Sequence, residues 1–178
     1  YNNQYAAVTD NCMENVRLGV QTGNFSQANP GSSAYQVISG NTMTVRKRGI
    51  FHNLAYNTAS AYTLSSNTIT GIVDANETVW DGILLASLSV PSTSTNNIIS
   101  GGLITNPSEG YEVWNVKSTT PTVITGGSVS NISTGLFVNN YDGYPALGSD
   151  APFGGHATVT GLSINPNAAG TGIYVKDN

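Results

Sequence analysis

A glycine followed by an apolar residue stands a short distance behind each of six copies of a second recurring pattern in this chain. The second pattern is a run of six residues with an apolar residue at its first and sixth positions and a polar or glycine break between them. Units this short cannot bury an apolar core alone, so a chain built from them must stack unit on unit. The six runs are Val8–Met13, Ile38–Met43, Leu64–Ile69, Ile99–Ile104, Ile124–Val129 and Val159–Ile164. The six pairs are Gly19-Val20, Gly49-Ile50, Gly82-Ile83, Gly110-Tyr111, Gly135-Leu136 and Gly172-Ile173.

The units have the periodicity of strands. Apolar residues alternate with Thr, Ser or Asn over three to five positions, and no amphipathic helix of three turns can be drawn. The spacing from one unit to the next varies, which suits fixed short strands joined by loops of different length. Strands that recur without helical crossovers pair best with their counterparts in the units above and below. We therefore predict an all-β fold, a parallel β-helix of about six rungs, in a single domain over residues 1–178.

The apolar residues at the repeated positions are predicted to line one continuous interior. A parallel stack that is cut at both ends leaves unpaired N–H and C=O groups there. We therefore expect further rungs or identical subunits at the open ends, and we interpret the chain as a fragment of a longer one. The predicted interior residues are Ile38, Met43, Ile50, Leu64, Ile69, Ile83, Ile99, Ile104, Ile124, Val129, Leu136, Val159, Ile164 and Ile173.

Composition limits the partners and the compartment. Charged residues make up 9% of the chain and the formal net charge is -4, so no basic field attracts nucleic acid. Cys12 is the single cysteine, which excludes an intrachain disulfide. No apolar run is long enough to span a bilayer, and we predict no membrane insertion. A surface built from Asn, Thr, Ser and Gly is unlike that of an ordinary cytosolic helical protein, and we expect an extracellular or cell-surface location.

The phrase Tyr35–Met43, followed by Gly49-Ile50, resembles the right-handed parallel β-helix repeats of the pectate-lyase-like superfamily. The resemblance covers nearly the whole chain and implies a right-handed coil. In that family a tight turn between two strands carries stacked Asn residues, whose amides bond to one another along the axis. Asn residues that fall at this turn here are Asn11, Asn41 and Asn67. Positions where the ladder is expected to lapse are Gly102, Gly127 and Leu162.

The resemblance also implies that ligands bind on the outer face of the strand after each glycine, with the long loop that follows as the rim. Strand parity assigns the apolar residue of each pair to the interior and the next residue to the outer face. Aromatic residues among these outward positions are suited to stacking on the apolar faces of sugar rings. The alternative is that loops or another subunit cover them. The outward residues are Gln21, Phe51, Leu84, Glu112, Phe137 and Tyr174. The predicted ligand-binding residues are Phe51, Glu112, Phe137, Tyr141, Tyr144 and Tyr174.

Four charged residues are the weak candidates for catalysis: Arg48, Asp81, Glu109 and Glu112. The alignment of the units puts them on adjacent rungs of one face. Glycoside hydrolysis needs two carboxyl groups on opposite sides of a bond, and lyase chemistry needs a base beside an acidic calcium cluster. A column of salt-bridging surface charges explains the four residues equally well. No Asp-Asp pair occurs, and His156 is not followed by the glycine that polygalacturonase-like members carry.

The two histidines do not indicate a metal site. His52 falls at an inward position and is interpreted as a satisfied interior histidine rather than a catalyst. His156 has no spaced His or Cys partner, so no transition metal is expected. We predict no metal and no cofactor.

Three classes of function are compatible with the sequence. The one that it favours is a non-catalytic surface or adhesive module that binds carbohydrate, and the alternatives are a polysaccharide lyase or glycoside hydrolase and a structural filament or fibre subunit. Carboxyl groups clustered on the outer face with raised pKa values would indicate an enzyme. Exposed aromatic residues without a pair of carboxyl groups would indicate a binding module. An outer face with neither feature would indicate a structural spacer.

Overall fold

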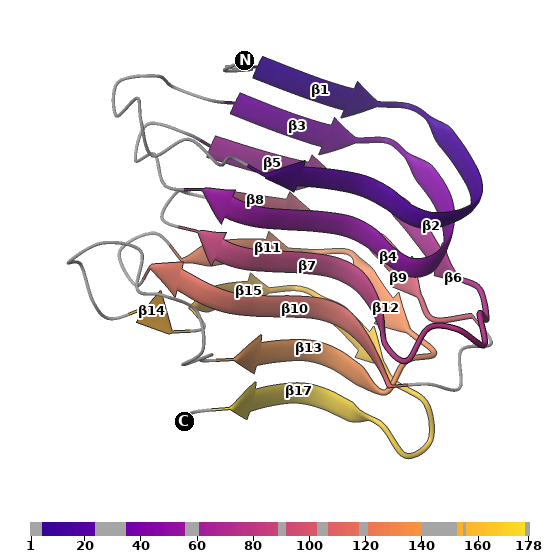
Figure 1. Cartoon of the computed structure of the whole chain (residues 1–178). Coiled ribbons are helices and arrows are strands. Elements are labelled where there is room, and N and C mark those ends of the chain that lie inside the picture. The colour runs from indigo at the N-terminus through magenta and orange to yellow at the C-terminus, as the bar shows by residue number, and fades with distance from the viewer. Residues whose placement is uncertain are drawn as a thin grey trace.

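The computed structural model describes residues 5–23, 35–55, 61–88, 92–102, 107–117, 121–139, 153–154 and 156–176. All regular elements in this part of the chain are β-strands, as predicted. None of these segments supplies a helix long and apolar enough to cross a membrane. The described strands run six times through the same order, and we call each run a coil (Figure 1). The coils are β1-β2, β3-β4, β5-β6-β7, β8-β9-β10, β11-β12-β13 and β15-β16-β17.

One strand from each coil contributes to a small parallel sheet, in the order β1-β3-β5-β8-β11-β15. Each strand begins a coil and pairs with the strand that begins the next one, so the order in the sheet follows the order in the chain. The strands are β1 (Tyr5–Thr9), β3 (Tyr35–Ser39), β5 (Ala61–Ser65), β8 (Ser92–Thr95), β11 (Thr122–Thr125) and β15 (Ala157–Thr160).

The other strands form a large sheet in the order β16-β12-β9-β6-β4-β7-β10-β13-β17, with β2 on β4 and β14 on β10. Its described pairs are parallel except that of β14 with β10. The strands are β2 (Cys12–Gly23), β4 (Thr42–Ala55), β6 (Thr68–Gly71), β7 (Trp80–Leu88), β9 (Ile98–Ser100), β10 (Ser108–Lys117), β12 (Ser128–Ser130), β13 (Thr134–Asn139), β14 (Phe153–Gly154), β16 (Ser163–Asn165) and β17 (Thr171–Lys176).

Strand β4 joins two rows of this large sheet. Its residues Thr42–Val45 pair with β6, and its residues Arg48–Ala55 pair with β7. We call the row formed by β2, β4, β7, β10, β13 and β17 the front row, because it faces the viewer in Figure 1. In cross-section each coil therefore runs along the small sheet, then along the second row, and then along the front row.

The six glycine-apolar pairs occupy equivalent places in the front row, as predicted. Their apolar residues are in register from coil to coil: Val20, Ile50, Ile83, Tyr111, Leu136 and Ile173. A Cβ atom at Gly49 would lie only 2.5 Å from the carbonyl oxygen of Gly82 and 2.5 Å from Cγ2 of Ile69. Only glycine fits here, because the backbones approach too closely for any side chain.

The fourth predicted run is out of register, and the structure corrects it. Ile99 pairs with Ile69 and Val129, which are sixth-position residues, rather than with the first-position residues. The first position of the fourth coil is Ser94, which pairs with Leu64. Ser94 is fully buried, and its hydroxyl lies 3.0 Å from that of Tyr111. The sequence pattern required an apolar residue at this position and therefore did not identify Ser94.

The correct register extends the asparagine ladder to a fourth member, Asn97, and removes Gly102 from it. The side-chain amide of Asn41 donates to Oδ1 of Asn67 at 2.9 Å, and that of Asn67 donates to Oδ1 of Asn97 at 2.9 Å. Asn11 begins the ladder with an equivalent bond to Asn41. The ladder lapses at Gly127, which would clash with the Asn97 backbone if it carried a Cβ.

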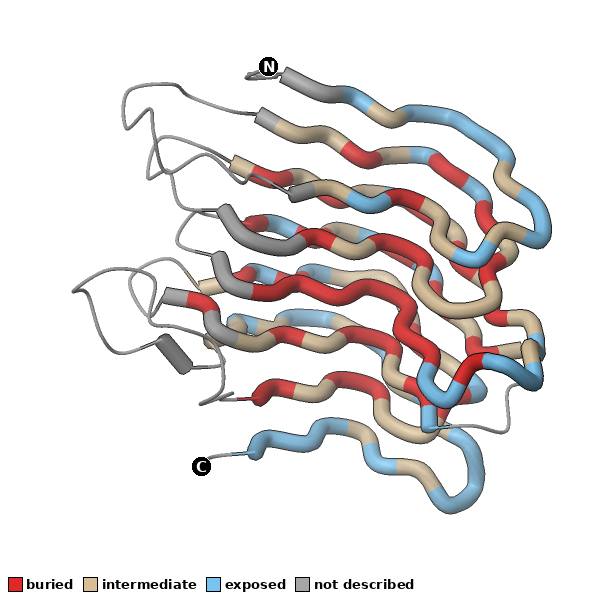
Figure 2. The backbone as a smooth tube through the Cα atoms, viewed as in Figure 1, coloured by how far each residue is buried: buried red, intermediate tan, exposed pale blue. Residues whose placement is uncertain are grey.

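Ten of the predicted interior residues are buried: Ile38, Met43, Ile50, Leu64, Ile69, Ile83, Ile99, Ile124, Val129 and Leu136. Val159 and Ile164 are half-buried, and Ile104 lies outside the described residues. The prediction for Ile173 is wrong, since this side chain is 54% exposed. It lies on β17, the last strand of the front row, where no described coil covers it. Figure 2 shows the same gradient, with buried residues in the middle coils and exposed residues in the first and last.

Candidate functional site

Each glycine-apolar pair brings two residues three positions apart to the same outer side of the front row. The Cβ position of Gly49 points inward at Ile69, and Ile50 is also inward and fully buried. Two successive inward residues interrupt strict alternation, so that both Arg48 and Phe51 project outward. The same geometry applies to Glu109 and Glu112 in β10.

Two outward columns result, one on each side of the pairs. Residues of the first column are Arg48, Asp81 and Glu109, continued by Thr134 and Thr171. Residues of the second column are Gln21, Phe51, Leu84, Glu112, Phe137 and Tyr174, in the register that the sequence predicted.

Three acidic residues meet where these columns adjoin. Each of Asp81, Glu109 and Glu112 offers a carboxyl oxygen, and these atoms all lie within 4.8 Å of one another. Asp81 is almost fully buried, and the two glutamates are half-buried. Nε of Arg48 donates to Oδ2 of Asp81 at 2.5 Å. The structure therefore brings together the four residues that the sequence marked for chemistry.

Burial raises the pKa values of these carboxyl groups, because it disfavours their charged forms. The pKa of Glu109 rises to about 7, first through burial and then through the nearby Asp81 carboxylate. The pKa of Glu112 rises to about 8 for the same reasons, with Glu109 adding to the repulsion. Burial also raises the pKa of Asp81, although the Arg48 guanidinium opposes this effect.

The three carboxyl groups are linked by hydrogen bonds. Hydrogen bonding between Asp81 and Glu109 lowers the pKa of Asp81 and raises that of Glu109. Hydrogen bonding between Glu109 and Glu112 lowers the pKa of Glu109 and raises that of Glu112. Arg48 favours the ionised form of Asp81, and Glu112 keeps its proton at neutral pH. We call these four residues the carboxyl cluster.

The aromatic residues of the second column are engaged within the front row. The guanidinium carbon of Arg48 lies 5.0 Å from the centroid of the Phe51 ring. The rings of Phe137 and Tyr174 stack at 5.2 Å with an interplanar angle of 7°. Neighbouring strands lie about 4.8 Å apart, so rings in one column stack along the coil axis and turn their edges outward. Tyr174, 49% exposed, has no described strand beyond it.

The remaining predicted site residues have different surroundings. Tyr141 and Tyr144 lie outside the described residues. Leu84 projects outward but is only 2% exposed, so this side of the front row is partly covered.

His52 is inward and buried, as the parity predicted. Its Nδ1 lies 2.5 Å from Oγ1 of Thr22, and its ring contacts that of Tyr62. Within the described residues its Nε2 has no hydrogen-bond partner, so the prediction of a satisfied histidine holds for one nitrogen only. Burial lowers the pKa of His52 to about 3, which keeps the imidazole neutral at physiological pH.

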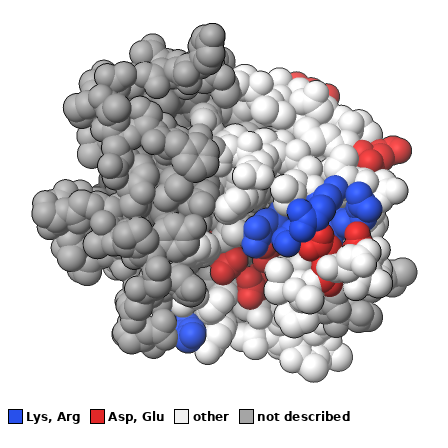
Figure 3. All heavy atoms as spheres, viewed as in Figure 1, with Lys and Arg blue, Asp and Glu red and all other residues white. Residues whose placement is uncertain are grey.

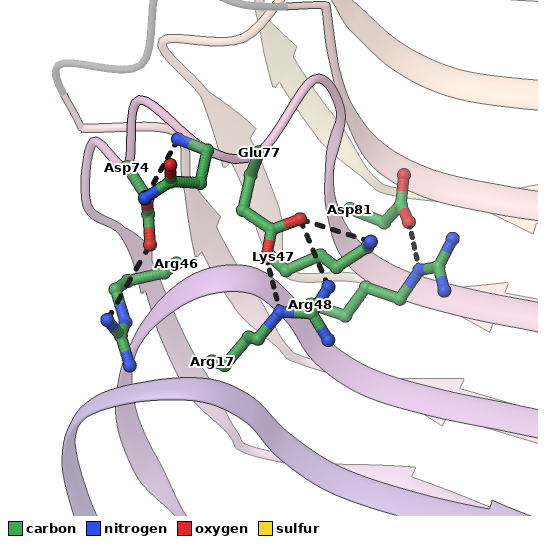
Figure 4. Close-up of polar contacts among 8 residues, drawn as sticks. Arg17, Arg46, Lys47, Arg48, Asp74, Glu77 and Asp81 are labelled. Carbon is green, nitrogen blue, oxygen red and sulfur yellow. Dashed lines mark hydrogen bonds and ion pairs between the residues drawn. The ribbon is translucent and has the colours of Figure 1, made fainter.

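A second charged group lies beside the carboxyl cluster, and sequence reasoning did not predict its ion pairs. Figure 3 shows a band of Lys and Arg side chains across the front of the molecule with acidic groups against it. Glu77 binds both Arg17 and Lys47, and Arg46 pairs with Asp74 at 3.6 Å (Figure 4). The acidic partners lie in residues 72–79, between β6 and β7. The sequence holds one sign of this segment: the third unit has more residues between its run, Leu64–Ile69, and its pair, Gly82-Ile83, than any other unit has.

The only metal-compatible set in the described part of the chain is Asp81, Glu109 and Glu112. Carboxylate oxygens suit hard cations such as Ca²⁺. Arg48 already pairs with Asp81, and Glu112 holds a proton at neutral pH. A metal cation would have to displace the Arg48 guanidinium and the Glu112 proton. The cluster is therefore better arranged for hydrogen bonding and proton transfer than for binding a metal.

Comparison of this chain with family models, curated proteins and solved structures found no match. Its function must therefore be inferred from the fold and the cluster.

Proposed function

We propose that this chain is part of a right-handed parallel β-helix of the pectate-lyase-like kind, on the cell surface or outside the cell, that binds carbohydrate on its front row. The alternation of the chain between stacked parallel sheets supports the β-helix. The asparagine ladder at a tight turn supports the likeness to that superfamily.

The observation that carries the binding role is the carboxyl cluster on the outer side of the front row. Sugar hydroxyls both donate and accept hydrogen bonds, and the cluster offers both a protonated Glu112 and carboxylate acceptors at neutral pH. Aromatic side chains flank it in the same column, Phe51 on one side and Phe137 on the other. Polar groups that fix orientation beside apolar rings are the usual composition of a ligand site.

A glycan array tests this role directly. Wild-type protein should bind a carbohydrate, and the variant Glu109→Gln/Glu112→Gln should bind it at least about tenfold more weakly, a loss of about 1.4 kcal/mol. Glu14→Gln is the matched control, because Glu14 is an exposed carboxylate on the first coil. Both variants should keep the wild-type circular dichroism spectrum. Full binding by the double variant would contradict the proposal.

The rings have a separate test. Phe51→Ala/Phe137→Ala should abolish binding if the aromatic column contacts the sugar. Tyr174→Ala asks the same question at the one ring that is exposed in the described structure. Undiminished binding in both variants would restrict the site to the carboxyl cluster.

Catalysis by the same cluster is the second candidate, and the raised pKa values favour it specifically. A carboxylic acid that keeps its proton at neutral pH can protonate a leaving group, while a neighbouring carboxylate stabilises charge or activates water. Glu112 would be the acid and Glu109 its ionisable partner. A reducing-sugar assay on the glycan bound in the array distinguishes the two roles. Turnover lost in Glu112→Gln would identify an enzyme, and binding without turnover would identify an adhesive module.

A further inference from the structure

The cations around the carboxyl cluster are already committed to partners. Arg48 bonds to Asp81 and lies over the Phe51 ring. Nζ of Lys47 lies 3.1 Å from the Glu77 carboxylate, which also binds Arg17. In the first three coils, each Lys or Arg of the described residues is paired with a carboxylate, and Arg17 and Lys47 share that of Glu77. Lys176 is exposed but lies on β17, two strands beyond β10.

An independent feature of the same outer side is a buried hydrogen-bond acceptor that has no described donor. Asn139 projects outward from β13, two residues after Phe137, and it is in register with Trp114 of β10. Asn139 is only 9% exposed, yet its Oδ1 has no hydrogen-bond partner in the described part of the chain. A buried acceptor without a donor is costly, and a hydroxyl group would satisfy it.

From these two features we infer that the carbohydrate bound on the front row is a neutral, hydroxyl-rich glycan and not one that carries uronate or sulfate groups. This inference rests on the proposed function. A hydroxyl group can accept from Glu112 and donate to Glu109 or to Oδ1 of Asn139 without bringing charge. A ligand carboxylate would add an anion to a partly buried group that holds three carboxyls and one cation, beside described Lys and Arg side chains that already have carboxylate partners.

Rising pH should strengthen the exclusion of acidic glycans. The groups facing the cluster are Arg48 and Lys47 from β4, Asp81 from β7, and Glu109 and Glu112 from β10. Of these, the two glutamates lose protons between about pH 7 and 8, so the face becomes more negative. The described residues Thr134 and Phe137 of β13 bring no charge.

The test uses paired polymers that differ only in charge. Suitable pairs are methyl-esterified and de-esterified polygalacturonan, and a glucan or mannan and its C6-oxidised form. Titrations at pH 6 and pH 8.5, each with EDTA and again with Ca²⁺, should show the neutral member bound at least about tenfold more tightly. Equal or tighter binding of the acidic member under any of these conditions would overturn the inference while leaving carbohydrate binding intact.

Variants separate this result from a simple loss of the site. At pH 8.5, Glu109→Gln/Glu112→Gln lowers the negative charge and keeps the shape, so the preference against acidic polymers should shrink to less than about threefold. Glu14→Gln should keep the wild-type preference. An unchanged preference in the double variant at pH 8.5 would overturn the inference, because the carboxyl groups would not be its source. Failure of wild-type protein to bind any polymer, neutral or acidic, would overturn the proposed function together with it.

Discussion

Single residues carry the stacking of this fold from coil to coil. Asn67 shows how completely one side chain can be used, because it is fully buried and bonds in three directions. Its Nδ2 donates to the Ile38 carbonyl at 2.8 Å and to Oδ1 of Asn97, and its Oδ1 accepts from Asn41. Each amide thus satisfies backbone and side-chain groups of the coils on both sides.

Asn67→Ala should therefore lower the free energy of unfolding by about 1–3 kcal/mol for each buried polar group left without a partner. Urea unfolding measures this loss. Asn11→Ala is the matched control at the exposed end of the ladder, where water can replace the amide, and it should cost no more than about 0.5 kcal/mol. Equal losses in the two variants would show that the ladder is not the source of the stability.

The glycines of the glycine-apolar pairs permit a second comparison, between the same substitution at a crowded position and at an open one. Gly49→Ala would place a methyl group 2.5 Å from a carbonyl oxygen, so the coils must shift, and overpacking of this kind costs about 1–3 kcal/mol. Gly172→Ala should change stability by less than about 0.5 kcal/mol, because nothing lies within 4 Å of its Cβ position. Thermal unfolding of the two variants measures the difference. A large loss in Gly172→Ala would mean that another coil or subunit packs on that end.

The sequence predicts these residues with different success. In the first five coils close backbone approach requires the glycine and burial favours its apolar neighbour, so the pair is visible in the sequence and its register was correct. Ser94 stands in place of an apolar residue and forms hydrogen bonds with Tyr111, 17 positions away, and with the side chain of Asn97. The apolar pattern of the run does not reveal these bonds. That substitution displaced the fourth run and hid Asn97.

At the scale of elements, the segment between β6 and β7 is held across the two preceding coils. Glu77, in residues 72–79, binds Arg17 of β2 and Lys47 of β4. A turn within the segment is closed where the Asn76 amide donates to Oδ1 of Asp74 at 2.9 Å. The first three coils are thereby joined at the surface as well as through the core.

Glu77→Gln should loosen this connection while keeping the shape of the side chain. Hydrogen exchange of residues 72–79 and of β2 should become faster, whereas exchange in β13 should not change. The Arg17 hydrogen bond is the main reason that the pKa of Glu77 lies below its usual value. Its contribution is therefore present above the ordinary glutamate pKa and is lost as pH falls through the lowered one. Unchanged exchange in the variant would mean that the segment is held by other contacts.

The carboxyl cluster could be located by alignment, whereas its electrostatics could not. Register alone places Asp81 and Glu109 on neighbouring strands, and the glycine pair turns Glu112 to the same side. Hydrogen bonding among the carboxyls and the pairing of Arg48 depend on burial, which a linear pattern does not contain. The catalytic and binding roles of these residues stay predictions.

At the scale of the whole molecule, two sets of buried groups give stability opposite dependences on pH. Glu109 and Glu112 have folded pKa values of about 7 and 8, above the 4.5 of a free glutamate, so their contribution is complete below that value and is lost as pH rises through 7 and 8. His52 has a folded pKa of about 3, below its usual 6.5. Its contribution is complete above 6.5 and is lost as pH falls toward 3.

Two glutamates outweigh one histidine, so the midpoint of thermal unfolding should fall as pH rises from about 5 to 8. The variant Glu109→Gln/Glu112→Gln should flatten this decline, because neither amide titrates. Glu14→Gln should leave the curve unchanged. A wild-type midpoint that rises steadily from pH 5 to 8 would show that the cluster does not hold its protons in the folded state.

The stacked coils also determine how the molecule would respond to a mechanical load. β1 and β17 lie at opposite ends of the stack, and the hydrogen bonds between strands run along the line that joins them (Figure 1). A pull along that line loads one strand pair at a time and peels the end coil from its neighbour, instead of shearing many bonds together. Equivalent residues such as Asn67 and Asn97 are 30 positions apart, so each peeled coil would release about 100 Å of chain. Extension would then proceed at low force in short steps, one coil at a time from the end of the stack.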